Sequence, residues 1–114
     1  MEFCGEVIEN LPVEDRLAMC NMAIEAGGKN GIIAPDKLTM KYIKAIKNKA
    51  KSGKGRFYAS DKDAAYCAVK EYDARKIEPL VACPNLPSNV KPAKALKNIS
   101  IDQVVIGSCT NGRI

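Results

Sequence analysis

Apolar positions recur at helical spacing early in the chain, and the flanking residues mark where that helix begins and ends. Pro12 fixes a first turn, and the acids Glu14 and Asp15 favour the positive end of a helix. A Gly-Gly pair at 27–28 supplies the left-handed conformation that caps helices. The pattern therefore predicts a helix over residues 13–26.

A second helix is predicted where apolar residues are interleaved with lysines. Met40, Ile43, Ile46 and Ala50 recur at helical intervals, and lysines occupy the other face. The Ser-Gly-Lys-Gly run at 52–55 would end this helix. The amphipathic pattern is typical of a surface helix with one buried face.

Short apolar runs on either side of this second helix predict strands. Residues 31–34, 77–83 and 101–106 each fit a strand, and residues 1–11 fit a short strand and a turn. Residues 61–72 are compatible with either a helix or a strand. Helices that alternate with short apolar strands favour an α/β layered architecture.

Chain length and proline content limit how these elements can be arranged. At 114 residues the chain is at most one domain of ordinary size. Prolines at positions 84, 87 and 92 predict that residues 84–98 form an extended surface connection.

The formal net charge of +5 comes mainly from one lysine-rich stretch. A nucleic acid is one possible partner for such a basic run. We interpret the run instead as a solvated helix face that leads into a Gly/Ser loop, because no aromatic residues for base stacking are interleaved with it. Its members are Lys41, Lys44, Lys47, Lys49, Lys51 and Lys54.

The five cysteines indicate neither a disulfide framework nor a zinc site. Their number is odd, no Cys-x-x-Cys occurs, and the chain has no histidine. The first residues lack the basic start and apolar core of a signal peptide, and no apolar run is long enough to cross a bilayer. These features favour a reducing, cytoplasmic compartment and no membrane partner.

Cys109 follows the predicted strand 101–106, immediately before a turn with an Asn-Gly pair. A cysteine at a strand exit can present its sulfur to a cleft, which suits a metal ligand or a nucleophile. Burial as a packing residue is the commoner outcome for a lone cysteine beside an apolar run. Ser108 is not interpreted as a hydrolase nucleophile, because the chain has no histidine to act as its base.

Asn21 and Glu25 are four residues apart on the predicted helix 13–26, so their side chains are expected on one face. An amide and a carboxylate placed this way can together hold one small polar ligand. From the spacing alone, an ordinary exposed Asn and Glu is the favoured interpretation.

Several segments resemble one known family. Residues 107–113, Gly-Ser-Cys-Thr-Asn-Gly-Arg, closely resemble the iron–sulfur signature of the aconitase superfamily, and specifically of the large subunits of 3-isopropylmalate dehydratase and homoaconitase. Residues 2–11 and 15–27 resemble the family's helix that carries an Asn and a Glu, with its lead-in, and residues 32–36 continue that pattern. Residues 79–90 resemble the segment upstream of the cysteine motif.

The resemblance implies an aconitase-like three-layer α/β fold, of which this chain spans parts of two adjacent domains. Residues 1–75 would carry the Asn/Glu helix, and residues 76–114 would begin the next domain and end at the cysteine motif, with the boundary near residues 73–80. Because the family's large subunits are several times longer, we interpret the chain as an internal fragment with poor autonomous stability. A naturally shortened reading frame is the alternative.

The resemblance also implies a [4Fe-4S] cluster held by three cysteines, of which Cys109 would be one and the other two would follow Ile114. The fourth iron would stay open and act as a Lewis acid on the substrate. Asn21 would lie beside the cluster, and Glu25 would hydrogen-bond the water or hydroxyl bound to that iron. With one thiolate, this chain alone is expected to be inactive. The remaining cysteines are interpreted as buried small hydrophobic residues: Cys4, Cys20, Cys67 and Cys83.

The implied activity is that of a hydro-lyase that isomerises 2-isopropylmalate to 3-isopropylmalate by dehydration and rehydration, a step of leucine biosynthesis. The implied substrate class is a small di- or tricarboxylic hydroxy acid, and the implied partner is a small subunit. A homoaconitase large subunit is the close alternative. A non-catalytic or RNA-binding aconitase-like remnant is the alternative from another class.

Overall fold

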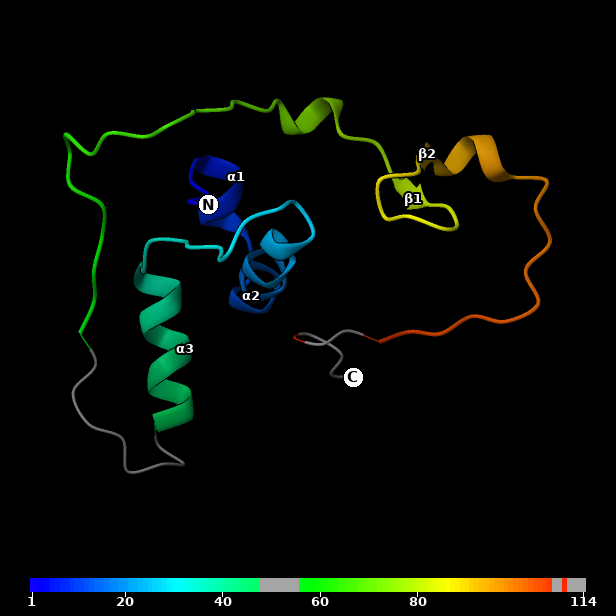
Figure 1. The fold of residues 1–114 in the computed structure, drawn as a ribbon. Helices are drawn as coiled ribbons and strands as arrows, with labels where there is room; N and C mark the ends of the chain where they lie inside the picture. The colour runs from blue at the N-terminus through cyan, green and yellow to red at the C-terminus, as the bar shows by residue number, and fades with distance from the viewer. Residues whose placement is uncertain (48–55, 108–109, 111–114) are drawn as a thin grey trace. The chain divides into compact units, whose positions relative to one another are not determined.

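The computed structural model describes residues 1–47, 56–107 and 110, which belong to two compact units (Figure 1). The first unit contains Met1–Tyr66 and Gly107–Ile114, and the second contains Cys67–Ile106. The domain boundary expected near residues 73–80 stays a prediction. Each unit is described by itself below.

The amino-terminal residues form one bridge and a short helix. Glu2 pairs with Ile32 in an isolated parallel bridge, and helix α1 spans Glu6–Asn10. Gly5 enters α1 with a φ of 103°, a conformation that favours glycine. The predicted strands in 1–11 and 31–34 are wrong in extent, because only one residue of each segment has a strand partner among those described. The prediction of a short strand and a turn over 1–11 also missed helix α1.

Helix α2 begins where the sequence predicts and changes character before its predicted end. It spans Val13–Asn21, and a 3₁₀ turn, η1, continues over Met22–Ile24. Gly27 has a φ of 83°, and its amide donates to the carbonyl of Ile24 at 2.9 Å. The predicted helix end at the Gly-Gly pair is thus confirmed by the left-handed conformation that glycine permits.

Helix α3, Lys37–Lys47, confirms the second predicted helix over its described part (Figure 1). Met40 and Ile43 are half-buried, as the amphipathic pattern predicts, whereas Ile46 is 50% exposed. The predicted end of this helix at 52–55 lies outside the described residues.

The side chain of Arg16 ties these three helices together. It is 4% exposed, and its Nε and Nη2 donate to the carbonyls of Leu11 and Glu9 at 3.0 and 2.7 Å, at the end of α1. Its Nη2 also forms an ion pair with Asp36 Oδ2 at 2.9 Å. Asp36 Oδ1 in turn accepts from the amide and hydroxyl of Thr39 at 2.9 and 3.1 Å, which caps the first turn of α3.

A close backbone approach holds the segment before α3 against α2. A Cβ atom built on Gly31 would lie 2.5 Å from Cys20 Cα and 2.7 Å from the Cys20 carbonyl oxygen. The absence of a side chain at Gly31 therefore lets this segment reach α2 and form the bridge at Ile32.

The second unit contains a hairpin flanked by two 3₁₀ turns. Strand β1, Leu80–Ala82, pairs antiparallel with β2, Val90–Pro92, with Val81 opposite Lys91. The flanking 3₁₀ turns are η2, Ala74–Lys76, and η3, Ala93–Leu96. The predicted strand in 77–83 is confirmed over β1. Residues 84–98 are more than the predicted extended connection, because they include β2 and η3.

The prediction of a strand over residues 101–106 is wrong for the structure as described. These residues form no regular element, and Val105 and Ile106 are 82% and 89% exposed. A strand needs a hydrogen-bonded neighbour, and the described residues supply none here. Residues 61–72, where helix and strand both remained open, likewise contain neither.

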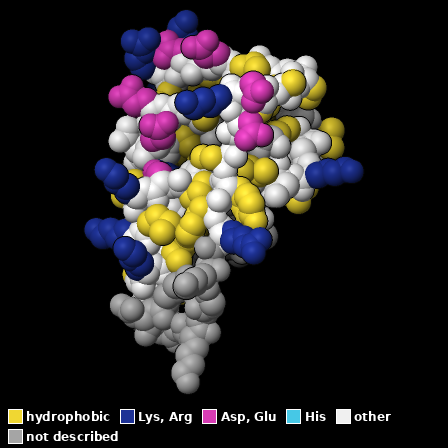
Figure 2. Space-filling model, turned by 90° about the vertical axis from the view of Figure 1, so that its left-hand side faces the viewer, with side chains coloured by type: hydrophobic (Ala, Val, Ile, Leu, Met, Phe, Trp, Pro, Cys, Tyr) yellow, Lys and Arg dark blue, Asp and Glu magenta, His cyan; other side chains and the backbone are white. Residues whose placement is uncertain are grey.

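Apolar burial is slight throughout the described residues. Ala23 is the one apolar residue among them that is buried, and hydrophobic side chains remain on the surface shown in Figure 2. The helices and hairpin fit the α/β class, while the three-layer arrangement stays a prediction. No helix among the described residues is long and apolar enough to span a membrane.

Arg16→Met is expected to lower the free energy of unfolding by about 2 kcal/mol, because the carbonyls of Glu9 and Leu11 lose their donor. Arg75→Met is the matched control, since Arg75 also pairs with an aspartate but its side chain is 90% exposed. Urea unfolding followed by circular dichroism should show a lower midpoint only for Arg16→Met. Equal midpoints for the two variants would contradict the role of Arg16.

Stability should also depend on the protonation of Asp36. The hydrogen bond from Arg16, with that from the Thr39 amide, holds the pKa of the Asp36 carboxyl well below its usual range. A depressed pKa in the folded state stabilises the fold above the unfolded pKa of about 3.9, and this contribution is lost as the pH falls. The stability difference between the native chain and Asp36→Asn should therefore be constant above about pH 5 and shrink as the pH falls from about 5 to 2. Parallel pH profiles would contradict this.

Candidate functional site

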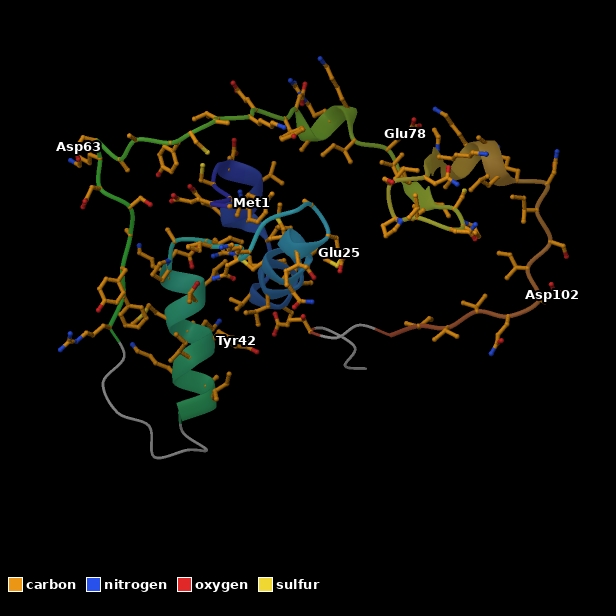
Figure 3. All side chains as sticks on the ribbon, in the orientation of Figure 1. Met1, Glu25, Tyr42, Asp63, Glu78 and Asp102 are labelled. Atoms are coloured by element: carbon orange, nitrogen blue, oxygen red, sulfur yellow. The ribbon has the colours of Figure 1, made fainter. Side chains whose placement is uncertain are left out.

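Asn21 and Glu25 lie on either side of the 3₁₀ turn that follows α2. Asn21 is the last residue of α2, and Glu25 follows η1 with φ −64° and ψ −26° (Figure 3). Both residues are exposed. Their roles as site residues stay predictions, but both are accessible to a ligand.

The 3₁₀ turn changes how these two side chains are related. The amide of Glu25 donates to the carbonyl of Met22, three residues earlier, at 3.1 Å. A 3₁₀ helix rotates by about 120° per residue, against about 100° in an α-helix. Glu25 is therefore rotated further from Asn21 around the helix axis than it would be in a continuous α-helix.

Buried contacts immediately beside the pair fix its backbone. Ala23, between Asn21 and Glu25, is 1% exposed, and its carbonyl accepts from the Gly28 amide at 2.9 Å. The preceding residue, Cys20, contacts Gly31 through its backbone. Two exposed polar side chains thus project from a backbone segment whose position is set on both sides.

Cys20 precedes Asn21 in the sequence, but the environment of its thiol does not favour metal binding. It is half-buried, and burial raises the pKa of its thiol. Iron requires the thiolate, so a raised pKa disfavours ligation. The interpretation of Cys20 as a packing residue agrees with this environment.

The interpretation of the other cysteines needs correction. Cys4 and Cys67 are exposed, so these two are not buried hydrophobic residues in the structure, and Cys83 is half-buried like Cys20. All four cysteines that the structure describes are free. The described residues contain no group of three or more His, Cys, Asp or Glu that could hold a metal ion.

Cys109, the expected cluster ligand, lies outside the described residues, as do Ser108 and the Asn-Gly turn that follows. Its role stays a prediction. Its position relative to Asn21 and Glu25 is likewise outside what the structure describes.

The sequence analysis did not identify a carboxylate that accepts hydrogen bonds from two hydroxyl groups. Glu2 Oε2 accepts from Ser60 Oγ at 2.7 Å and from Tyr66 Oη at 2.8 Å. These two hydrogen bonds lower the pKa of the Glu2 carboxyl and connect the segment 56–66 to the amino-terminal residues. Separations of 58 and 64 residues leave no local signal by which the sequence could have indicated them.

Comparison with known proteins shows the family to which this chain belongs. A model of the aconitase family (aconitate hydratase) matches residues 1–97, a range that includes Asn21 and Glu25. The chain therefore belongs to the aconitase family.

Individual relatives extend the match to the whole chain. This chain is 61% identical over 114 residues to the 3-isopropylmalate dehydratase large subunit of Thermodesulfovibrio yellowstonii. The large subunit 1 of Pyrococcus furiosus is 61% identical over 116 residues, and the large subunit of Heliobacterium modesticaldum 54% over 114. Each alignment covers 100% of this chain and 26% of the relative, so the chain spans about a quarter of the length of these curated relatives.

Proposed function

We propose that this chain is a segment of the large subunit of a hydro-lyase that isomerises 2-isopropylmalate to 3-isopropylmalate in leucine biosynthesis. The observation that carries the proposal is identity of 54–61% to proteins named as such large subunits, over the full length of the chain. The reaction removes water from the hydroxy acid and adds it back at the neighbouring carbon. A homoaconitase large subunit is the second candidate from the sequence motif, and the relatives' names favour the first.

The cofactor proposed for this activity is a [4Fe-4S] cluster, to which the chain would contribute Cys109. The described residues contain no ligand set for it, and the other two thiolates would come from outside these 114 residues. When bound, the cluster would supply a Lewis-acidic iron for the substrate's hydroxyl and carboxylate groups. The chain by itself should therefore hold no stable cluster and catalyse no dehydration.

Glu25 is proposed to move the proton that the reaction needs at the leaving hydroxyl. In the dehydration the hydroxyl group gains a proton and departs as water while the neighbouring carbon loses a proton, and the rehydration reverses both transfers. An exposed carboxyl group on a fixed segment suits this exchange. Asn21 would orient the same hydroxyl through its side-chain amide, which can both donate and accept hydrogen bonds.

The finer architecture and the partners are part of the same proposal. The chain would lie across two domains of a three-layer α/β subunit, with residues 1–75 in one and 76–114 in the other. A small subunit would complete the site for a di- or tricarboxylic hydroxy acid, since the relatives are named large subunits. A reducing cytoplasmic compartment suits a chain whose described cysteines are all free.

A segment exchange tests the proposed activity directly. The corresponding quarter of the Thermodesulfovibrio yellowstonii large subunit is replaced by this chain and produced anaerobically with its small subunit. We expect turnover of 2-isopropylmalate and little of homocitrate. The reverse preference would favour homoaconitase, and an iron-loaded chimera without turnover of either acid would contradict the proposal.

In this chimera Cys109→Ser should abolish retention of the cluster, because one of its three thiolates is lost. Cys20→Ser is the matched control and should leave the iron content near normal, since burial raises the pKa of the Cys20 thiol. Iron and acid-labile sulfide per subunit are the readouts. Equal iron loss in both variants would mean that the ligand has been misassigned.

Glu25→Gln should retain the cluster and lower turnover by about 10²–10⁴-fold, because the amide preserves size and reach but cannot exchange the proton. Glu14→Gln is the control: Glu14 is an exposed acid at the opposite end of α2. Turnover and iron content are measured on the same preparation, so that cluster loss is not mistaken for a catalytic defect. Near-normal turnover with an intact cluster would contradict the proposed role and show that Glu25 is an ordinary solvated residue.

A further inference from the structure

An open groove of about 710 Å³ runs along one side of α3, within the first unit. Its walls come from α3, from the two residues that precede this helix, and from one aromatic residue of the segment 56–66. The lining residues are Pro35, Asp36, Lys37, Met40, Lys41, Lys44 and Phe57.

The α3 residues of the groove share one face of the helix. Met40 and Lys41 each lie three or four positions after Lys37 and three or four before Lys44, so each of these pairs lies about 5–6 Å apart at its Cβ atoms. The three lysines are exposed, and Met40 is half-buried between them. Phe57, 45% exposed, adds a second large apolar surface. Figure 2 shows hydrophobic side chains flanked by Lys and Arg side chains.

The positive charge of this groove is not neutralised from within. Among the described residues, no carboxylate forms an ion pair with Lys37, Lys41 or Lys44. Asp36, the one acid of the lining, is committed to Arg16 and to the capping bonds with Thr39. The amino-terminal end of the 11-residue helix α3 lies at the same end of the row and adds its partial positive charge.

We propose that this groove is a docking surface for an acidic amphipathic helix of a protein partner. Carboxylates at helical spacing on the partner would match the row of lysines, and apolar side chains between them would cover Met40 and Phe57. A single-stranded nucleic acid fits less well, because it uses a series of aromatic stacking platforms and the groove has one aromatic residue. This surface uses neither Asn21 nor Glu25 and is independent of the proposed catalytic function.

The test uses the full 114-residue chain and a fluorescein-labelled helical peptide of about 20 residues. The peptide carries Glu at positions i, i+4 and i+7 with Leu between them, and a scrambled peptide of equal composition is the control. Fluorescence anisotropy should show saturable binding of the patterned peptide, weakened several-fold between about 50 and 300 mM salt. The scrambled peptide should bind at least fivefold more weakly.

Two lysine variants separate the groove from the net charge of the chain. The first variant removes the groove charges: Lys37→Gln/Lys41→Gln/Lys44→Gln. Its affinity for the peptide should be about tenfold lower, because three exposed ion pairs are lost and each contributes modestly. The control triple removes the same charge from exposed lysines elsewhere and should change affinity less than twofold: Lys62→Gln/Lys70→Gln/Lys97→Gln. Circular dichroism of each variant verifies that helix content is retained.

Phe57→Ser should weaken binding several-fold without altering its salt dependence, because it removes apolar contact only. Equal losses in the two lysine triples would attribute binding to net charge and overturn the proposal. Absence of saturable peptide binding would overturn it too. A single-stranded oligouridine probe that binds with dependence on Lys37, Lys41 and Lys44, while the peptide does not, would assign the groove to nucleic acid instead.

Discussion

Burial of the Arg16 guanidinium is the constraint on which the first unit depends. A buried charge is tolerated only when its donors find partners, and Arg16 finds them in two carbonyls at the end of α1 and in the aspartate that caps α3. The relative placement of three helices thus follows from hydrogen-bond directions. With Ala23 as the one buried apolar residue among those described, apolar packing contributes little to that placement.

Local signals in the sequence predicted α2 and α3 and missed the five-residue helix α1, whereas the failures among the strands follow from non-local pairing. Pro12, the acids that follow it and the Gly-Gly pair mark α2 through backbone effects within a few residues, and the interleaved lysines mark α3. A strand depends on a neighbour that the sequence does not specify. The apolar run 101–106 therefore looked like a strand yet forms none, while β2 arose in a proline-rich segment expected to be a connection.

The candidate site was predicted more from the resemblance of its sequence motifs to a known family than from the spacing of its residues. A separation of four residues marks Asn21 and Glu25 as neighbours on a continuous α-helix, but it does not indicate the 3₁₀ turn between them. Their exposure and the buried Ala23 that fixes the backbone are properties of the folded chain alone. The Arg16 and Glu2 contacts were likewise missed, because their partners are distant or depend on the turn geometry.

The two hydroxyl contacts of Glu2 have a consequence for how the first unit opens. They close a loop of some sixty residues through exposed side chains, so their net contribution is small beside the entropy that loop closure removes. The segment 56–66 should therefore detach in sub-global fluctuations that leave α2 in place. Phe57 would move away with this segment. The loss of the Glu2 contacts and the loss of one wall of the α3 groove would therefore be a single opening event.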